Sequence, residues 1–310
     1  MPRPFRARRS VLAVPGSNPR MLDKARGLPA DQVLLDLEDG VAEGAKPAAR
    51  GTVVEALRGG DWGARTLSVR VNALSTRHTY RDVVEVVEGA GRRLDVVVLP
   101  KVQSAAHVVW LDLMLTQIEA TMRFEPGRIG IEAQVEDPRG LLDVEAIAAA
   151  SPRLEALVFG PGDWAAATGM RSVVVGEQPP GYDGGDAFAY PLMRLLVAAR
   201  AHGLQVVDGP YQRFEDVDGL RRKAARAAAL GFDGTWVVHP SQLPVANEAF
   251  TPTQAEHDRA QDVLAAVAAA AGSGTGAVRL GGEVVDEASA AMARAVVQRG
   301  RAGGLVRSEI

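Results

Sequence analysis

The chain has 310 residues, 47% of them hydrophobic and 24% charged, which is enough to bury one large core or two ordinary ones. Its formal net charge of −3 excludes a general attraction to nucleic acid or to an anionic membrane surface, so an anionic ligand must be held by a local basic cluster. The absence of cysteine excludes disulfides, thiolate metal ligands and a cysteine nucleophile, and it favours a cytoplasmic protein.

The first ten residues are basic, with Arg3, Arg6, Arg8 and Arg9, but they lack the apolar core of a signal peptide. We therefore expect a disordered or ligand-facing tail here. The longest purely apolar stretch, residues 263–271, is about half as long as a membrane-spanning helix, so we expect no membrane association.

Eight short apolar runs rich in β-branched residues recur along the chain, with helical patterns between them. Most are continuously apolar rather than alternating, which is typical of parallel strands covered on both faces. We predict an α/β fold, a (β/α)8 or TIM barrel, with strands at residues 10–14, 32–37, 66–71, 95–99, 128–135, 155–159, 204–207 and 235–238. The predicted helices cover residues 19–26, 47–58, 81–89, 105–121, 144–150, 189–203 and 216–230.

Two further segments lie outside the regular barrel pattern. Residues 169–187 form a glycine- and proline-rich loop, and a loop of this length is either a lid or disordered. We divide the chain into a barrel domain, residues 1–250, and a C-terminal helical extension, residues 251–310, with helices at 253–271 and 288–299 and an apolar run at 278–285 between them. We interpret the extension as a cap that packs over a barrel mouth, either of its own chain or of a neighbouring subunit. The alternative is a solvated pair of peripheral helices.

The sites of TIM barrels are built where the strands end, and the residues after these eight runs are strongly polar. In chain order they are Ser17, Asn18, Asp36, Glu38, Asp39, Arg70, Asn72, Lys101, Glu136, Asp137, Asp163, Asp208 and His239. Carboxylates gathered in this way repel one another unless a cation offsets their charge. The pattern therefore predicts a metal site at the carboxyl ends of the strands.

Glu136 and Asp163 follow neighbouring strands and suit Mg²⁺, with Mn²⁺ as an alternative, because these hard cations take oxygen ligands and leave positions for substrate and water. The lack of cysteine and the single nearby histidine disfavour zinc. Alternatively, Glu136 pairs with an arginine and Asp163 caps a helix that begins at Trp164. Glu132 is a competing ligand inside the strand.

The acidic cluster of Asp36, Glu38 and Asp39 either holds metal-bound waters or orients Arg70 and Lys101 by ion pairing, and we favour the second role. Arg70 is our candidate for gripping a substrate carboxylate with two parallel hydrogen bonds; a structural ion pair with the cluster is the alternative.

Lysines on barrel strands can form imines with keto substrates, but Lys101 lies beside many acids that keep an ammonium charged, so we favour an electrostatic role. For His239 we favour hydrogen bonding to substrate or backbone over acid/base catalysis.

Eight short motifs in this order and spacing resemble the citrate lyase beta subunit and malyl-CoA lyase family, CoA-ester lyases of the HpcH/HpaI aldolase superfamily. They are Val-Pro-Gly-Ser-Asn (14–18), Leu-Asp-Leu-Glu-Asp (35–39), Arg-Val-Asn (70–72), Pro-Lys-Val (100–102), Val-Glu-Asp-Pro-Arg-Gly (135–140), Phe-Gly-Pro-Gly-Asp (159–163), Val-Asp-Gly-Pro (207–210) and His-Pro-Ser-Gln (239–242). The resemblance runs from about residue 10 to residue 299.

The resemblance implies a Mg²⁺-dependent lyase, a homotrimer or homohexamer, that cleaves malyl-CoA, methylmalyl-CoA or citramalyl-CoA to an acyl-CoA and an α-keto acid such as glyoxylate. The family's metal ligands fall on Glu136 and Asp163 and its substrate arginine on Arg70. Its other substrate contacts fall on Asn18, Lys24, Gly162, Val238 and His239. Asp286 matches the family's catalytic aspartate, which an adjacent subunit delivers.

Three other functions stay open at this point. They are a malyl-CoA thioesterase that uses the same site, a citrate lyase beta-like subunit that needs partner proteins, and a metal-dependent aldolase for small keto acids without CoA. For the CoA phosphates, the N-terminal arginines together with Arg20 and Lys24 form the best basic cluster in the sequence.

Overall fold

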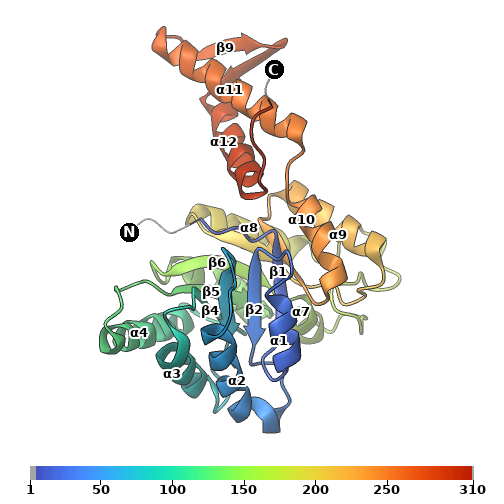
Figure 1. Ribbon diagram of the computed structural model, residues 1–310. Coiled ribbons are helices and arrows are strands. Elements are labelled where there is room, and N and C mark those ends of the chain that lie inside the picture. The colour runs from blue at the N-terminus through green and yellow to red at the C-terminus, as the bar shows by residue number, and fades with distance from the viewer. Residues whose placement is uncertain (1–4, 309–310) are drawn as a thin grey trace. The chain divides into compact units, whose positions relative to one another are not determined.

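The structure is a computed structural model that describes residues 5–308, and it divides into two compact units, Met1–Ala246 and Asn247–Ile310. The first unit is a closed barrel of eight parallel strands in the order β1 to β8, with β8 pairing back to β1 (Figure 1). The predicted (β/α)8 barrel is confirmed. The strands are β1 (Ser10–Pro15), β2 (Gln32–Asp36), β3 (Thr66–Arg70), β4 (Val96–Leu99), β5 (Gly130–Val135), β6 (Leu154–Phe159), β7 (Gln205–Asp208) and β8 (Gly234–Val237).

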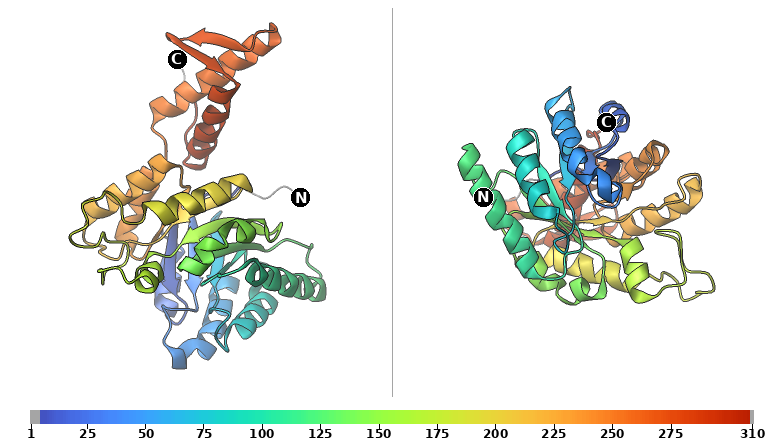
Figure 2. Two further views of the ribbon diagram at one scale, coloured as in Figure 1. Left: turned by 180° about the vertical axis from the view of Figure 1, so that it is seen from behind. Right: turned by 90° about the horizontal axis from the view of Figure 1, so that it is seen from below.

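Helices lie outside the strands and cover the barrel, as the view from below shows (Figure 2). The seven predicted helices are α1 (Pro19–Ala25), α2 (Lys46–Arg58), α3 (Thr79–Ala90), α4 (Ala105–Met122), α6 (Val144–Ala149), α8 (Ala189–Ala201) and α9 (Val217–Leu230). Several short ones were not predicted: η1 (Glu43–Ala45), α5 (Pro138–Leu142), α7 (Pro161–Thr168), η2 (Pro240–Gln242) and α10 (Leu243–Ala249). Within residues 5–308, no helix has the length and apolar character to span a membrane.

The middle of the barrel is filled by apolar side chains from alternate positions of the strands, as the two-residue period of a strand requires. Among them are Val11, Leu34, Val98, Val207 and Trp236. Polar side chains lie on the same inward face above and below this layer. The apolar layer therefore separates the two ends of the barrel.

The N-terminal arginines close the end of the barrel where the strands begin, so the expected disordered or ligand-facing tail is wrong. Arg8 is fully buried and its guanidinium pairs with Glu132 at 2.8 Å and Glu155 at 2.6 Å. Arg6 also pairs with Glu155, and Arg9 pairs with Asp31 at 2.7 Å. The prediction for Arg3 lies outside the described residues.

The long loop 169–187 is held beside the segment that follows β7. Val175 and Gln212 exchange backbone and side-chain hydrogen bonds of 3.0 and 3.2 Å, and Arg213 pairs with Glu177 at 2.9 Å. Gly176 has a φ of +80°, and a Cβ there would lie 2.3 Å from the Pro210 carbonyl oxygen. The first half of the loop is therefore anchored rather than disordered.

The second unit packs α11 (Gln254–Gly272) against α12 (Glu287–Ala302) around Ala260, Val263 and Val297. The run predicted between them is an antiparallel hairpin, β9 (Ala277–Leu280) and β10 (Glu283–Asp286). Gly281 and Gly282 make the turn with φ values of +59° and +87°. A two-residue Gly-Gly connection between short apolar runs is typical of hairpins, whereas the prediction named only one apolar run at residues 278–285.

Candidate active site

A cavity of about 400 Å³ opens at the carboxyl ends of the strands. Its lining includes Pro15, Asp36, Asp39, Arg70, Gln134, Glu136, Gly160, Gly162, Asp163, Val175, Gln212, Trp236 and Val238. Parallel strands bring all their C-terminal ends to one side of the barrel, and this geometry gathers residues from positions 15 to 238 of the sequence. Most of the site residues expected from the sequence in the barrel therefore surround one space.

Arg70 is held in place by the acidic residues that follow β2. Asp36 and Arg70 lie directly opposite each other on adjacent strands, and Asp36 accepts two hydrogen bonds of 2.7 Å from the Arg70 guanidinium. Glu38 pairs with the remaining terminal nitrogen at 2.8 Å, and the ring of Trp236 lies 5.3 Å from the guanidinium carbon. Burial alone would raise the pKa of Asp36, but the Arg70 charge lowers it. Asp36 is therefore ionised and fixes the guanidinium at the cavity wall.

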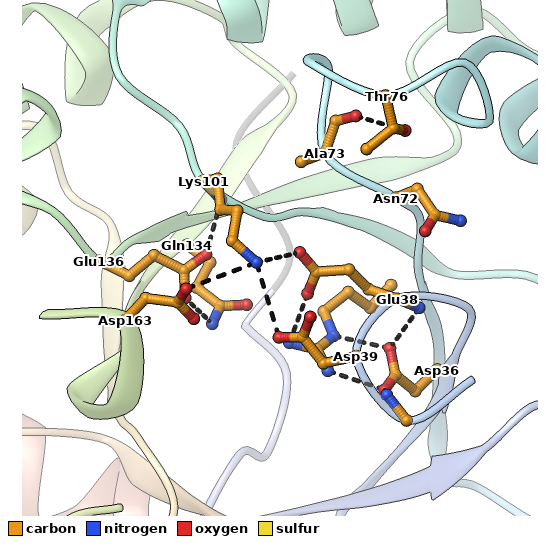
Figure 3. A network of polar contacts seen from close by, with 12 residues as sticks. Asp36, Glu38, Asp39, Asn72, Ala73, Thr76, Lys101, Gln134, Glu136 and Asp163 are labelled. Atoms are coloured by element: carbon orange, nitrogen blue, oxygen red, sulfur yellow. Dashed lines mark hydrogen bonds and ion pairs between the residues drawn. The ribbon is translucent and has the colours of Figure 1, made fainter. Parts of the chain in front are cut away.

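Lys101 connects the acidic cluster with the opposite side of the cavity (Figure 3). Its ammonium lies 2.7 Å from Glu38, 3.6 Å from Asp39 and 3.6 Å from Asp163. Burial opposes the charge, yet the hydrogen bond and charge of Glu38 raise the pKa of Lys101. A protonated amine is not a nucleophile, so these carboxylates disfavour imine formation by Lys101.

Glu136 is almost completely buried at the end of β5. Its carboxylate accepts a 2.7 Å hydrogen bond from the Lys101 backbone N–H and a 2.6 Å hydrogen bond from the Gln134 side chain. Burial, followed by the charges of Glu38 and Asp163, raises its pKa well above the usual range. In the part of the chain that the structure describes, Glu136 forms no ion pair with an arginine, so that alternative is wrong.

Asp163 lies in the first turn of α7, with 41% of its side chain exposed, and faces Lys101 and Glu136. The helix begins at Pro161 with Gly160 as N-cap, so the alternative in which Asp163 caps a helix starting at Trp164 is wrong. A Cβ on Gly160 would lie 2.3 Å from a Glu136 oxygen. Gly160 therefore gives the Glu136 carboxylate its room.

This donor set fits a hard divalent cation. The site has two basic side chains, Arg70 and Lys101, and more carboxylates than these can neutralise. The five carboxylates are those of Asp36, Glu38, Asp39, Glu136 and Asp163. Among residues 5–308 no group of three or more His, Cys, Asp or Glu side chains lies in an arrangement that could hold a metal ion. Mg²⁺ typically uses only one or two carboxylates and keeps several waters, so Glu136 and Asp163 suffice.

Comparison with known proteins agrees with this geometry. The family described as HpcH/HpaI aldolase/citrate lyase matches residues 9–240. The chain belongs to this family. It is 41% identical to the L-malyl-CoA/beta-methylmalyl-CoA lyase of Cereibacter sphaeroides over 305 residues, 96% of this chain and 95% of that protein. The family resemblance and the enzyme class inferred from the motifs, a carbon–carbon lyase family, are confirmed.

Two further relatives bear on the chemistry. A (3S)-malyl-CoA thioesterase of Cereibacter sphaeroides is 37% identical over 294 residues, 95% of each chain. The crystal structure of the CitE protein of Mycobacterium tuberculosis in complex with magnesium, acetoacetate and coenzyme A superposes with a TM-score of 0.73 at 34% identity, covering 94% of this chain and 97% of that one. Both a lyase and a thioesterase thus occur among the family members that resemble this chain.

The other residues expected from the sequence lie in the segments that follow β1, β6 and β8. Val238 and Gly162 line the cavity, and Asn18 caps α1 by accepting a hydrogen bond from the Met21 N–H. Lys24 is exposed on the same helix. His239 is exposed beside Val238, its Nδ1 bonded to Ser241 at 2.8 Å.

Three polar residues from the strand ends serve the scaffold instead of the cavity. Asp208 forms a buried ion pair with Lys223 of α9. Asp137 caps α5 by accepting the Gly140 N–H at 2.8 Å. Asn72 accepts from Lys46 at 2.6 Å and donates to Asp82. Glu132, considered above as a competing metal ligand, pairs with Arg8 on the far side of the apolar layer, so that alternative is wrong.

Asp286 belongs to the second unit, where it is exposed and caps α12. It accepts a 3.0 Å hydrogen bond from the Ser289 N–H, and this bond lowers the pKa of its carboxyl. In this state Asp286 is a weak base.

Three residues at the site were missed in the sequence. Gln134 holds the Glu136 carboxylate, and the alternation of Glu132, Gln134 and Glu136 on one face of an otherwise apolar strand was a usable signal. Trp236 faces Arg70 from β8, where a single large aromatic residue near a strand end gave no specific indication. The ring of Phe214 stacks on His239, the residue after Val238, at a centroid distance of 4.6 Å, and Phe214 is 43% exposed; its position in a loop gave no indication of this contact.

Proposed function

We propose that the protein is a Mg²⁺-dependent lyase that reversibly cleaves a 3-hydroxyacyl-CoA such as malyl-CoA or methylmalyl-CoA into an acyl-CoA and an α-keto acid. The observation that carries this proposal is the convergence of buried Glu136 with Asp163 on a cavity that Arg70 also lines. The near full-length similarity to an L-malyl-CoA/beta-methylmalyl-CoA lyase supports the substrate class. The complex of the CitE protein with magnesium and coenzyme A supports the cofactor and the thioester.

Glu136 and Asp163 would hold the ion, oriented by the Lys101 amide and by Gln134. When bound, Mg²⁺ supplies Lewis-acid polarisation of the keto carbonyl; Mn²⁺ is the alternative ion. The protein's own task is to keep both carboxylates in position before the ion and the substrate arrive, and the rigid strand ends are suited to it.

Arg70 offers a second fixed positive charge to the keto acid. Its pairs with Asp36 and Glu38 engage three nitrogens but not all five N–H donors, so donors remain for a substrate oxygen. Since the guanidinium is already ordered, no reorganisation is needed when negative charge develops on that oxygen during bond cleavage. Arg70 can therefore bind the substrate and pair with the acidic cluster at the same time.

Asp286 is our candidate for the base that takes a proton from the methyl carbon of the acyl-CoA and returns it in the cleavage direction. Its exposure and its place on the second unit favour delivery to the site of a neighbouring subunit in a homotrimer or homohexamer. The Ser289 hydrogen bond must break or weaken there, because it favours the charged, weakly basic form.

The CoA moiety carries phosphates that the barrel rim must meet. Arg20 and Lys24 are exposed on α1 on either side of Met21, whose side chain lines the cavity. The N-terminal arginines are removed from this cluster by their ion pairs at the other end of the barrel. Two basic side chains remain as candidates for the phosphates.

A subunit-mixing experiment tests the delivery of Asp286. Glu136→Gln chains and Asp286→Asn chains are each expected to be inactive, whereas mixed oligomers regain activity at sites that combine an intact barrel with an intact Asp286. Absence of recovery in mixed oligomers verified by mass spectrometry would place the base elsewhere.

Product identification tests the activity itself. The purified chain with malyl-CoA and Mg²⁺ should release glyoxylate and acetyl-CoA. Release of malate and free CoA instead would identify the second candidate, a malyl-CoA thioesterase, which the 37% identical relative favours. Turnover by the chain alone would also exclude a subunit that needs partner proteins, and CoA dependence would exclude a small keto-acid aldolase.

A further inference from the structure

Lys101 has a backbone conformation that a lysine rarely adopts. Its φ is +52°, and among residues 5–308 it shares a positive φ outside glycine only with Arg123, which ends α4. The left-handed region costs energy for any residue with a Cβ, and it persists only where the surrounding structure enforces it. A glycine would avoid this cost, so something specific to the lysine side chain is required here.

The unusual backbone lets one residue act on both sides of the cavity. The Lys101 N–H points to Glu136 and donates a 2.7 Å hydrogen bond, while the side chain turns towards the acidic cluster and reaches Glu38 at 2.7 Å. The ammonium also lies 3.6 Å from Asp163 (Figure 3). Lys101 therefore touches both of the carboxylates assigned to the metal, one through its backbone and one through its charge.

We propose that Lys101 is a positioning residue with two opposed effects on the metal site: its backbone amide fixes Glu136 for the cation, and its ammonium weakens the binding of that cation. This inference rests on the proposed metal site. The effect of the ammonium is to offset part of the acidic excess while no metal is present and to keep the bound ion exchangeable.

The weakening follows from the distances. A cation bound to Asp163 lies close to an ammonium that is itself 3.6 Å from an oxygen of the same carboxylate, and like charges this close repel strongly in a half-buried site. The ammonium cannot withdraw easily, because Glu38 is buried and Lys101 is its direct hydrogen-bond partner. The site thus binds its divalent ion against a permanent positive charge.

Removal of the charge should therefore tighten metal binding. Binding of Mn²⁺ alone is measured by electron paramagnetic resonance of the free ion and by calorimetry, at fixed pH and without substrate. Lys101→Met is expected to lower the dissociation constant by about tenfold or more, and Lys101→Arg to leave it within about threefold of the wild type. Arg77→Met, at an exposed ion pair with Glu43 outside the cavity lining, is the matched control for loss of one positive charge.

Lys101→Gly repeats the charge removal with a residue that suits the positive φ, so a folding defect of Lys101→Met does not decide the outcome. Unchanged or weaker Mn²⁺ binding in both charge-free variants would overturn the inference and make Lys101 an ordinary support of the site. Absence of Mn²⁺ binding in the wild type would instead overturn the proposed metal site, so the two failures are distinguishable.

Discussion

The two ends of the barrel contain the same kinds of charged residue but differ in how those charges are paired. At the N-terminal end, Arg8 is fully buried and pairs with Glu132 and Glu155. At the C-terminal end, Arg70 pairs with Asp36 and Glu38, but Glu136 and Asp163 add further negative charge around an open cavity. A buried charge that loses its partner destabilises a fold, so the matched charges at the N-terminal end depend on one another, whereas an accessible excess of one sign indicates a candidate ligand site.

Strand β5 contains both situations. Glu132 lies within the strand and Glu136 directly follows it, four positions further along the chain, with Gln134 between them. Glu132 meets an arginine, whereas burial and neighbouring carboxylates raise the pKa of Glu136. The same type of side chain is structural within the strand and, in our proposal, a cation ligand directly after it.

The largest expected effect is a loss of activity on substitution of Glu136, which we do not expect on substitution of Glu132. Glu136→Gln should lower kcat/KM for malyl-CoA by roughly 10²- to 10³-fold without lowering the free energy of unfolding, because it removes a buried charge while its amide oxygen can still accept the Lys101 N–H. Gln134 can turn its amide to accommodate the change, since its Oε1 has no hydrogen-bond partner among residues 5–308. Steady-state kinetics and urea denaturation measure the two quantities.

Glu132→Gln is the matched control on the same strand. It should lower the free energy of unfolding by about 2–4 kcal/mol, because it leaves the buried Arg8 charge with one carboxylate fewer, while kcat of the folded protein stays near the wild-type value. Equal losses of activity in the two variants would contradict the division of labour along β5.

Arg8→Met tests the closed end of the barrel, where the strands begin, by removing the ion-pair partner of Glu132. It leaves Glu132 without its guanidinium and Glu155 with Arg6 alone, and we expect the free energy of unfolding to fall by about 3–5 kcal/mol. Arg77→Met, at an exposed ion pair, should change it by less than about 1 kcal/mol. A small effect of Arg8→Met would mean that the arginine is not needed to seal the barrel.

Arg70→Lys tests the open end. The lysine keeps the charge but not the two parallel bonds to Asp36, so we expect kcat/KM to fall by roughly 10- to 100-fold. The free energy of unfolding, measured in urea, should change less than in Arg8→Met because solvent in the cavity can reach the displaced charges. Full activity of Arg70→Lys would show that only charge is required at this position.

A smaller effect concerns the strained backbone at Lys101. Lys101→Gly should be more stable than Lys101→Ala by about 1 kcal/mol, because alanine keeps the Cβ penalty at a φ of +52° and glycine does not. Both variants lack the ammonium, so the comparison isolates the backbone. Equal denaturation midpoints would indicate that the turn carries no strain.

The smallest expected effect concerns Phe214, which stacks on His239. Phe214→Leu removes the ring stacked on His239 and should raise KM for the CoA ester by roughly 3- to 5-fold with kcat little changed. Tyr190→Leu, at another exposed aromatic residue, on helix α8, should leave both constants unchanged. A loss of kcat rather than a rise of KM would give the stack a role in the chemical step.

The sequence predicted the open end of the barrel better than the closed end. Carboxylates that directly follow apolar strands necessarily meet at one edge of a parallel barrel, so the grouping of Asp36, Arg70, Glu136 and Asp163 follows from local pattern and topology. Arg8 could not be placed in this way, because its partners Glu132 and Glu155 are more than a hundred residues away in the chain. Before these contacts are known, a buried arginine near the N-terminus resembles any basic tail.

The central claim is that the open end of the barrel binds one divalent cation between Glu136 and Asp163. The most direct test is anomalous diffraction from crystals of the wild-type protein soaked with Mn²⁺. We predict a single strong peak between these two carboxylates and none near Glu132. Absence of a peak there, or a peak that other side chains hold, would contradict the account.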